Sequence, residues 1–223
     1  MSIELSGTVD ENNFSEYKKL LQNSKLKIII TKVFFIHYNH DEIIELIFGN
    51  RNLEKIHFGS CLLNNYTSNI SNALLCNTNL KILNISVSKF DPENFYEIMN
   101  ALGTNNTLEE LYMNNCRFGY SGAKEIANML LINTTLRKLH IRTNYIGNNG
   151  FIEIINALKS NFTLMELDVT YYNGITEEFV QELMNMLEIN NVITIHGIDH
   201  LLPENFFLNR KNSRKIKSAR NKN

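Results

Sequence analysis

Hydrophobic residues recur along this chain at nearly regular intervals, in the series Leu53, Leu80, Leu108, Leu136, Leu164 and Val192. Each opens a phrase of alternating apolar and polar positions, which is clearest from Leu136 through Leu139 and Ile141 to Asn144. Alternation with a period of two predicts a β-strand with one buried face. The phrase therefore predicts one short strand per repeat, with Leu139 and Ile141 pointing inward and the intervening His140 pointing outward.

The second half of each repeat carries apolar residues at helical spacing. Phe95, Ile98 and Leu102 fall on one helix face, and Pro92 suits the first turn of that helix. Each predicted helix runs into an asparagine, in the series Asn23, Asn50, Asn77, Asn105, Asn133, Asn161 and Asn190. Asparagine is the best non-glycine residue for a left-handed backbone turn. We therefore expect each helix to end there in that conformation.

A polar ladder is expected where each strand ends. The eighth position after the opening hydrophobic residue holds, in successive repeats, Phe34, Cys61, Ser88, Cys116, Asn144, Tyr172 and His200. Polar side chains at this position would satisfy backbone groups that are buried as the chain leaves the strand. Phe34 and Tyr172 depart from the pattern, so the ladder is expected to be irregular in those two repeats.

A strand and a helix repeated in this way, with the leucine and asparagine phrase described above, resemble the ribonuclease-inhibitor-like class of leucine-rich repeats. This class also includes the sensor domains of NOD-like receptors, the Ran GTPase-activating proteins and the tropomodulin C-terminal domain. The resemblance implies an α/β solenoid, a curved horseshoe with a parallel β-sheet on its concave face and α-helices on its convex face. It specifies the fold more than the function, because the motif residues build the core.

The repeats divide the chain into four parts. Residues 26–191 form the repeats, and residues 1–25 are expected to be an N-terminal capping unit, because solenoids seal their ends with atypical units. Ile3 and Leu5 would form an edge strand of that unit, and Phe14 and Tyr17 would lie on one face of its helix. Residues 192–209 are expected to be a degenerate capping repeat, and residues 210–223 a disordered basic tail.

The net charge of −1 conceals an uneven distribution of charge. The segment 210–223 carries seven of the 22 Lys and Arg and none of the 23 Asp and Glu, so the rest of the chain is clearly acidic. An acidic body makes nucleic-acid binding by the folded repeats unfavourable in physical terms, except weakly through the tail. A run of like charges is typical of a solvated tail, and nuclear import or nucleic-acid binding are the alternative interpretations.

No pattern of catalytic, metal-binding or cofactor-binding residues emerges from the sequence. The three cysteines, Cys61, Cys76 and Cys116, form neither a disulfide framework nor a metal motif. The N-terminus does not read as a signal peptide, and no apolar run approaches the ~20 residues that cross a bilayer. We therefore expect a cytoplasmic protein, with nuclear location as an alternative through the tail, that needs no cofactor, small-molecule substrate or membrane.

The concave face is the predicted interaction site. Its outward residues include a mixed polar and aromatic set: Tyr112, Asn114, Lys138, His140, Arg142, Asp168 and Tyr171. Tyrosine and arginine are the residue types that most often anchor protein interfaces, so Tyr112, Arg142 and Tyr171 are expected to carry most of the binding energy. Lys138 and Asp168 are expected to act as rim charges that tune association rate. A cross-strand charge ladder that keeps the sheet soluble is the alternative interpretation.

These observations favour a non-catalytic module that binds another protein, whose identity the sequence does not reveal, mainly through its concave face. Two alternatives follow from the resemblance. One is a regulator of a small GTPase, as in the Ran GTPase-activating proteins. The other is an actin-associated role like that of the tropomodulin C-terminal domain, whose repeats also end in a basic tail.

Overall fold

A computed structural model describes residues 2–6, 14–23, 25–32, 40–58 and 63–203. Its eight strands form one sheet in chain order, with every neighbouring pair parallel. The strands are β1 (Ser2–Ser6), β2 (Ile28–Lys32), β3 (Lys55–Phe58), β4 (Ile82–Asn84), β5 (Glu110–Tyr112), β6 (Lys138–His140), β7 (Glu166–Asp168) and β8 (Thr194–His196). This is the predicted α/β leucine-rich repeat solenoid.

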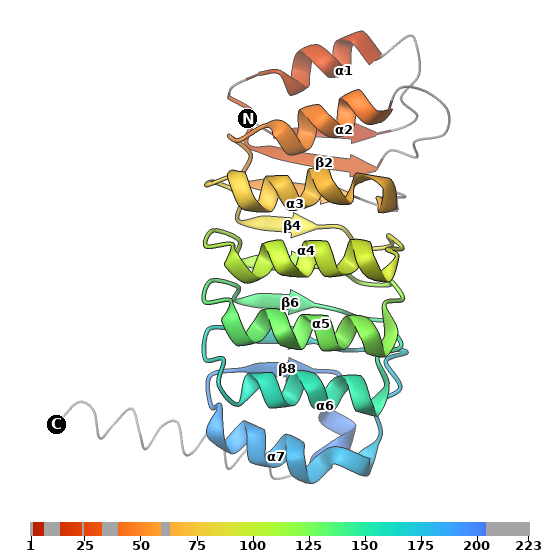
Figure 1. Cartoon of the computed structure of the whole chain (residues 1–223), viewed down its shortest axis with the longest axis vertical. Coiled ribbons are helices and arrows are strands. Elements are labelled where there is room, and N and C mark those ends of the chain that lie inside the picture. Colours follow the sequence, from red (N-terminus) through yellow and green to blue (C-terminus); the bar gives the residue numbers. More distant parts are fainter. Residues whose placement is uncertain (1, 7–13, 24, 33–39, 59–62, 204–223) are drawn as a thin grey trace, which may run out of the picture.

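The helices lie side by side on one face of this sheet and leave the other face uncovered (Figure 1). They are α1 (Phe14–Leu21), α2 (His40–Gly49), α3 (Thr67–Cys76), α4 (Pro92–Thr104), α5 (Gly119–Ile132), α6 (Gly147–Leu158) and α7 (Val180–Ile189). Short 3-10 turns occur at η1 (Asn64–Tyr66), η2 (Glu177–Phe179) and η3 (Asp199–Leu201). We call the helix-covered side the convex face and the uncovered side of the sheet the concave face.

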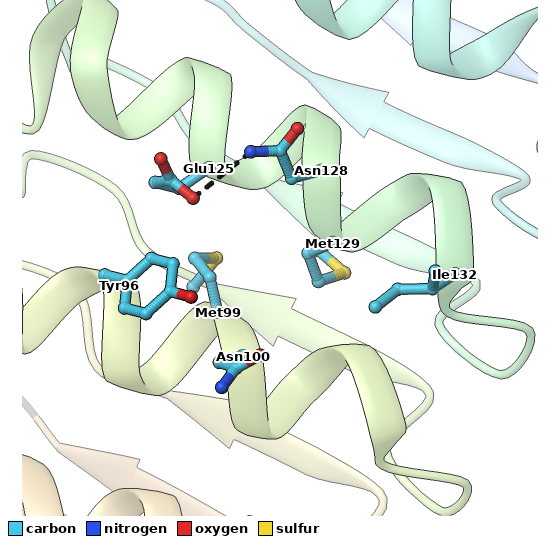
Figure 2. A pocket seen from close by; sticks show the side chains of 7 residues that line it. All are labelled: Tyr96, Met99, Asn100, Glu125, Asn128, Met129 and Ile132. Carbon is cyan, nitrogen blue, oxygen red and sulfur yellow. Dashed lines mark hydrogen bonds between the residues drawn. The ribbon is translucent and has the colours of Figure 1, made fainter.

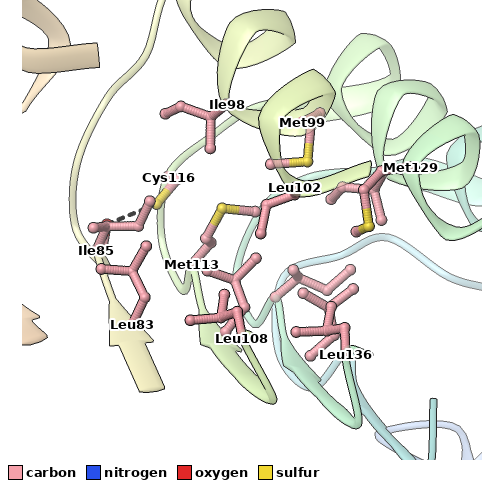
Figure 3. Packing of buried hydrophobic residues seen from close by; sticks show 14 of the residues in the cluster. Leu83, Ile85, Ile98, Met99, Leu102, Leu108, Met113, Cys116, Met129 and Leu136 are labelled. Carbon is pink, nitrogen blue, oxygen red and sulfur yellow. Dashed lines mark hydrogen bonds between the residues drawn. The ribbon is translucent and has the colours of Figure 1, made fainter. Parts of the chain in front are cut away.

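The register confirms the predicted strand pattern. Leu139 pairs with Leu111 on one side and with Leu167 on the other, and all three side chains are fully buried. Strands, helices and intervening turns build one continuous apolar core between the sheet and the helix layer (Figure 3). In that core Met113 lies on the strand side, and Ile98 and Leu102 enter from α4 (Figure 3).

Each end of the described sheet is a strand that lies within one of the predicted terminal units. β1 and α1 lie within the predicted N-terminal unit, and β1 pairs with β2 at the first edge of the sheet. At the other end, β8 and η3 lie within the predicted degenerate repeat. The predicted basic tail, residues 210–223, lies outside the described residues.

The predicted left-handed conformation of the asparagine series is wrong. Asn77, Asn105, Asn133 and Asn190 all have extended backbones, with φ between −94° and −67°. Five helices, α2, α3, α4, α5 and α7, end directly before their asparagines, whereas α1 and α6 end two and three residues before Asn23 and Asn161. Each asparagine thus lies at or shortly after the end of a helix, as predicted. From Asn77 onward the amide side chain, rather than backbone freedom, explains the asparagine: it turns inward, is buried, and bonds the backbone of its own coil and of the coil before it.

Asn133 shows this arrangement in full. Its Nδ2 donates to the carbonyl oxygens of Leu102 at 2.7 Å and of Asn105 at 3.2 Å. Its Oδ1 accepts from the backbone N–H of Thr135 at 2.9 Å and of Leu136 at 2.8 Å. Asn161 and Asn190 repeat the pattern one and two coils later. We call this series of buried amides the asparagine ladder.

The last repeat begins one residue later than predicted. Val192 is 41% exposed, whereas Ile193 is fully buried and occupies the position of the opening leucine. Asn190 fixes this register, because its Oδ1 accepts from the backbone N–H of Ile193 as Asn161 accepts from that of Leu164. The interval from Leu164 to Ile193 is therefore one residue longer than the interval from Leu136 to Leu164.

Candidate functional site

The sheet register brings the predicted concave-face residues into two rows. Glu110, Lys138 and Glu166 are aligned on β5, β6 and β7. Tyr112, His140 and Asp168 form the second row, which continues to His196 on β8. Because successive parallel strands lie ~4.8 Å apart, side chains in one row contact each other across the strands.

At the β5–β6 end, Glu110 pairs with the charged Lys138 and also accepts a hydrogen bond from Tyr112. Lys138 Nζ lies 2.8 Å from Glu110 Oε1, and the Tyr112 hydroxyl donates to Glu110 Oε2 at 2.8 Å. Burial would raise the pKa of Glu110, but the hydrogen bonds from Lys138 and Tyr112 outweigh it and keep that pKa below its ordinary value. Burial, aided by the bond to Glu110, raises the pKa of Tyr112 to about 12. Both groups therefore keep their ordinary charge states near neutral pH.

At the β6–β7 end, Asp168 lies beneath Arg142. Arg142 Nε donates to Asp168 Oδ2 at 2.6 Å, while Asp168 Oδ1 accepts from the Thr170 hydroxyl at 2.7 Å and from its N–H at 3.1 Å. Burial would raise the pKa of Asp168, but the bonds from Arg142 and Thr170 outweigh it and keep the pKa low. The carboxylate is therefore ionised, and both of its oxygens accept hydrogen bonds.

The prediction that Asp168 is an exposed rim charge is wrong. Only 2% of its side chain is exposed, because Arg142 covers it from the neighbouring coil. Asn114 is also partly committed to structure, since its Oδ1 accepts from the backbone N–H of Arg142 at 2.9 Å. Arg142 and Lys138 remain nearly half-exposed, so both cationic groups stay accessible to solvent.

His140 lies in the middle of this face and is largely covered. Its ring packs against the Tyr112 ring, with centroids 4.5 Å apart, and its Nε2 lies 3.3 Å from Glu166 Oε1 without making a hydrogen bond. Its Nδ1 lies 3.6 Å from Asp168 Oδ2. Burial lowers the pKa of His140, and the two carboxylates oppose that shift only in part. The imidazole is therefore neutral at physiological pH.

Acidification is expected to destabilise the fold in two stages. The folded-state pKa of His140 is below its unfolded value of about 6.5, so the stability contributed by the neutral ring is present above that value and is lost as pH falls through the folded pKa. The low pKa values of Glu110 and Asp168 place their losses lower, below about pH 4. Urea unfolding at several pH values should show a smaller loss between pH 7 and 5 for His140→Gln than for the unchanged chain. Equal losses in both proteins would contradict this assignment.

The polar ladder at the strand ends differs from its predicted form. Asn144 fills its predicted place: it is buried, donates to the Met113 carbonyl at 2.8 Å and accepts from the N–H of Cys116 at 2.7 Å. In the next coil Asn173, not Tyr172, is buried there and accepts from the N–H of Asn144 at 2.8 Å. The ladder is thus continuous from Asn144 to Asn173. Of the other predicted members, Ser88 is buried, His200 is exposed, and Phe34 and Cys61 lie outside the described residues.

One inserted residue causes the shift and forms a bulge at the end of β7. The N–H of Thr143 donates to two successive carbonyls, of Thr170 at 3.2 Å and of Tyr171 at 3.0 Å. Tyr171 and Tyr172 both adopt positive φ, of 56° and 38°, and their side chains are 71% and 72% exposed. The sequence places Tyr171 correctly on the surface. It gives one signal for the bulge: the spacing from Asn144 to Asn173 is one residue longer than the spacing between equivalent positions in the preceding repeats.

The hollow between α4 and α5 is small. On the convex face, Tyr96, Met99 and Asn100 of α4 face Glu125, Asn128, Met129 and Ile132 of α5 across a space of about 160 Å³ (Figure 2). Small-molecule sites usually occupy ~300–1,000 Å³ and present several convergent polar groups. Asn128 donates a hydrogen bond to Glu125 at 3.3 Å, so this bond lies within α5 and does not cross the hollow. The α4–α5 hollow is therefore a gap between helices.

The described residues form neither a metal site nor a membrane-spanning helix. Among them, no three His, Cys, Asp or Glu side chains are grouped so that they could hold a metal ion. None of their helices is both long and apolar enough to span a membrane. Of the cysteines with described surroundings, Cys76 is exposed and Cys116 is buried, and both are free thiols.

Comparison with known proteins gives a consistent picture. The family model described as TMOD/LMOD Leucine-rich domain matches residues 88–215, which is more than half of the chain. Among solved structures, leiomodin-1 actin-binding site 2 is 19% identical, with a TM-score of 0.58, over 84% of this chain and 100% of that one. The tropomodulin C-terminal domain from Caenorhabditis elegans is 16% identical, with a TM-score of 0.59, over 70% of this chain and 99% of that one. No curated protein matches the sequence.

Proposed function

Because this chain belongs to the TMOD/LMOD leucine-rich domain family, we propose that it is a non-catalytic cytoplasmic module that binds actin through its solenoid. The observation that carries the proposal is the family match over residues 88–215. It is supported by the likeness in fold to a domain described as leiomodin-1 actin-binding site 2, all of which is covered by this chain. Such a module needs a rigid surface and no reaction chemistry.

We assign the main contact to the concave face, from Tyr112 to Tyr171. Its charges are held in fixed positions by Glu110 and Asp168, so a partner meets an ordered surface and orders few side chains on binding. Tyr171 is the most exposed of the predicted anchors, and Arg142 presents the part of its guanidinium that Asp168 does not occupy. Exposed tyrosine and arginine side chains of this kind are typical hot-spot residues.

Binding of the purified chain to labelled actin monomers, and co-sedimentation with actin filaments, tests this function. We expect saturable binding that Tyr171→Asn weakens at least ~10-fold, because a hot-spot truncation typically costs ~2 kcal/mol or more. Asparagine tolerates the positive φ of this position, so the substitution removes the ring without straining the backbone. Tyr171→Asn is a cleaner test than Arg142→Ala, which would leave the buried Asp168 carboxylate without its cation.

Lys124→Glu provides the matched control, since Lys124 is exposed on α5 and so belongs to the convex side. This change is expected to leave actin binding within ~2-fold, as isolated surface charges contribute little. Absence of binding to both monomers and filaments would reject the proposed function. Binding that Lys124→Glu abolishes and Tyr171→Asn does not would instead place the contact on the convex side.

The basic tail is expected to add a separate, salt-dependent contribution. A chain that ends at Asn209 lacks the seven Lys and Arg of the tail and should bind an acidic protein more weakly at low ionic strength. This difference should shrink as salt rises, whereas the effect of Tyr171→Asn should persist. The alternative of a small-GTPase regulator is not proposed, because the family match points to the TMOD/LMOD domain.

A further inference from the structure

A second surface, distinct from the concave face, lies at the edge where the strands lead into the helices. Tyr145 and Tyr172 stand there on consecutive coils and are 55% and 72% exposed. With Gly147, Asn173 and Gly174 they line a depression of about 380 Å³. A Cβ built on Gly147 would meet no neighbouring atom within 4 Å, so the glycine floor is open to a ligand. The result is an open depression bordered by two exposed tyrosines, which we call the tyrosine slot.

The polar groups of this slot are already engaged within the fold. The N–H of Tyr145 donates to the Tyr172 carbonyl at 3.1 Å, and the N–H of Gly147 donates to the Asn173 carbonyl at 2.8 Å. The Asn173 amide bonds inward, to the carbonyls of Ile141 and Val169. A ligand in the slot therefore finds aromatic surface and few free donors, which favours an apolar side chain.

Backbone geometry supports a role for the two rings. Tyr145 and Tyr172 adopt positive φ, of 59° and 38°, which glycine or asparagine would adopt with less strain. Bulky side chains in such conformations cluster at functional sites, because the rest of the structure must compensate for the strain. Here the strain holds two large side chains in solvent, where they contribute little to the core.

Basic side chains continue the same edge on the two preceding coils. Arg117 and Lys89 precede Tyr145 by one and two repeats, and both are exposed. Arg117 shares the positive φ of Tyr145, at 57°, which confirms that the two positions are equivalent. Neither cation forms an ion pair with any residue whose placement the structure describes. Two such cations beside an aromatic slot stand out on a body that is acidic as a whole.

We propose that this edge, defined by Lys89, Arg117, Tyr145 and Tyr172, binds an extended acidic segment of a partner protein. A proline of that segment fills the tyrosine slot, since proline rings pack against aromatic side chains and the extended polyproline conformation is already ordered. Carboxylates of the segment lie beside Arg117 and Lys89. Coils are ~4.8 Å apart and an extended chain rises ~3.1 Å per residue, so these acids stand about two and four residues from the proline.

A synthetic peptide tests this geometry without knowledge of the natural partner. The probe is fluorescein-labelled Glu-Ser-Glu-Ser-Pro-Ser-Glu-Ser-Glu, whose symmetry makes the direction of binding irrelevant. Fluorescence anisotropy with the full chain at about 50 mM salt, where screening is weak, should show saturable binding. The same peptide with serine in place of proline, or with lysine in place of every glutamate, should bind at least ~10-fold more weakly.

Matched variants of the chain locate the contact. Tyr172→Asn removes one wall of the slot and keeps a residue suited to positive φ, and Arg117→Glu reverses the central charge. Each should weaken binding of the acidic peptide at least ~10-fold. Tyr171→Asn and Lys124→Glu, which change an equally exposed tyrosine and another exposed cation, should leave it within ~2-fold. Thermal unfolding of each variant confirms that it remains folded.

Three outcomes would overturn the proposal: no saturable binding of the acidic peptide, equal binding of its serine version, or equal weakening by Tyr171→Asn. None of these depends on actin, so failure here is distinguishable from failure of the proposed function. Conversely, loss of actin binding in Tyr171→Asn with intact peptide binding would show two separate surfaces.

Discussion

Replacing Leu139 with alanine is expected to lower the free energy of unfolding by about 2–5 kcal/mol, the usual range for a buried leucine. Leu139 is fully buried at the centre of β6, between Leu111 and Leu167 on the neighbouring strands. Its loss leaves a cavity that the flanking coils cannot fill without moving the sheet. Chemical unfolding followed by circular dichroism measures the effect. The control is Lys138→Ala at the adjacent position, whose half-exposed side chain forms an ion pair with Glu110 and should contribute less than ~1 kcal/mol.

The same substitution should also loosen the link between the two halves of the solenoid. Strands pair only with those of adjacent coils in the described sheet, so β6 is the connection between β5 and β7. Damage to a middle coil of a repeat protein uncouples its neighbours. Hydrogen exchange should therefore show the coils on the two sides of β6 losing protection separately rather than together. A single sharp transition with an unchanged midpoint would be evidence against this arrangement.

The second large effect is expected from Asn133→Ala, which should lower the free energy of unfolding by about 3 kcal/mol or more. The substitution leaves the carbonyls of Leu102 and Asn105 and the N–H groups of Thr135 and Leu136 without the amide that now bonds them. The two carbonyls keep one other bond each, from the N–H of Asn105 to the Leu102 carbonyl and from the Thr135 hydroxyl to the Asn105 carbonyl. The loss therefore falls mainly on the two N–H groups, at ~1–3 kcal/mol each, and water that enters the space reduces the sum. The measurement is again the free energy of unfolding.

Asn128→Ala is the matched control for that experiment. Asn128 is exposed on α5, the helix that leads into Asn133, and its amide bonds only the side chain of Glu125 among the described residues. Alanine has the higher helix propensity, so this change should be neutral or slightly stabilising. If Asn128→Ala and Asn133→Ala had similar effects, the asparagine ladder would carry little of the stability.

The sequence was sufficient for the fold because one pattern is repeated in phase many times. Period-two alternation around Leu139 and helical spacing around Phe95 each predict an element, and their recurrence at a nearly constant interval predicts how the elements stack. The asparagine series was located correctly but explained wrongly. Its position in the chain is visible in the sequence, whereas the carbonyls that its amides bond belong to the preceding coil and appear only in three dimensions.

For the candidate site, the sequence predicted which residues share one face of the sheet, but not which of them are exposed to solvent. Alternation predicted that Tyr112, His140 and Asp168 share one face, which the register confirms. It could not predict that Arg142 would cover Asp168, because that contact depends on side-chain conformations on neighbouring coils. The single-residue insertion near Tyr172 also escaped prediction. The last repeat is one residue shorter between Ile193 and Ile195, which offsets the insertion and restores the strand register.

The asparagine ladder gives the solenoid a direction of assembly. Each ladder amide donates backwards, to carbonyls of the coil that precedes it in the chain, as Asn161 does to Leu130 and Asn133. A chain emerging from the ribosome presents its N-terminal coils first, so every new amide meets acceptors that are already in place. Removal of coils from the C-terminus leaves carbonyls that water can satisfy. Removal from the N-terminus instead leaves buried amide donors without acceptors, so growth and truncation of this protein are not symmetrical.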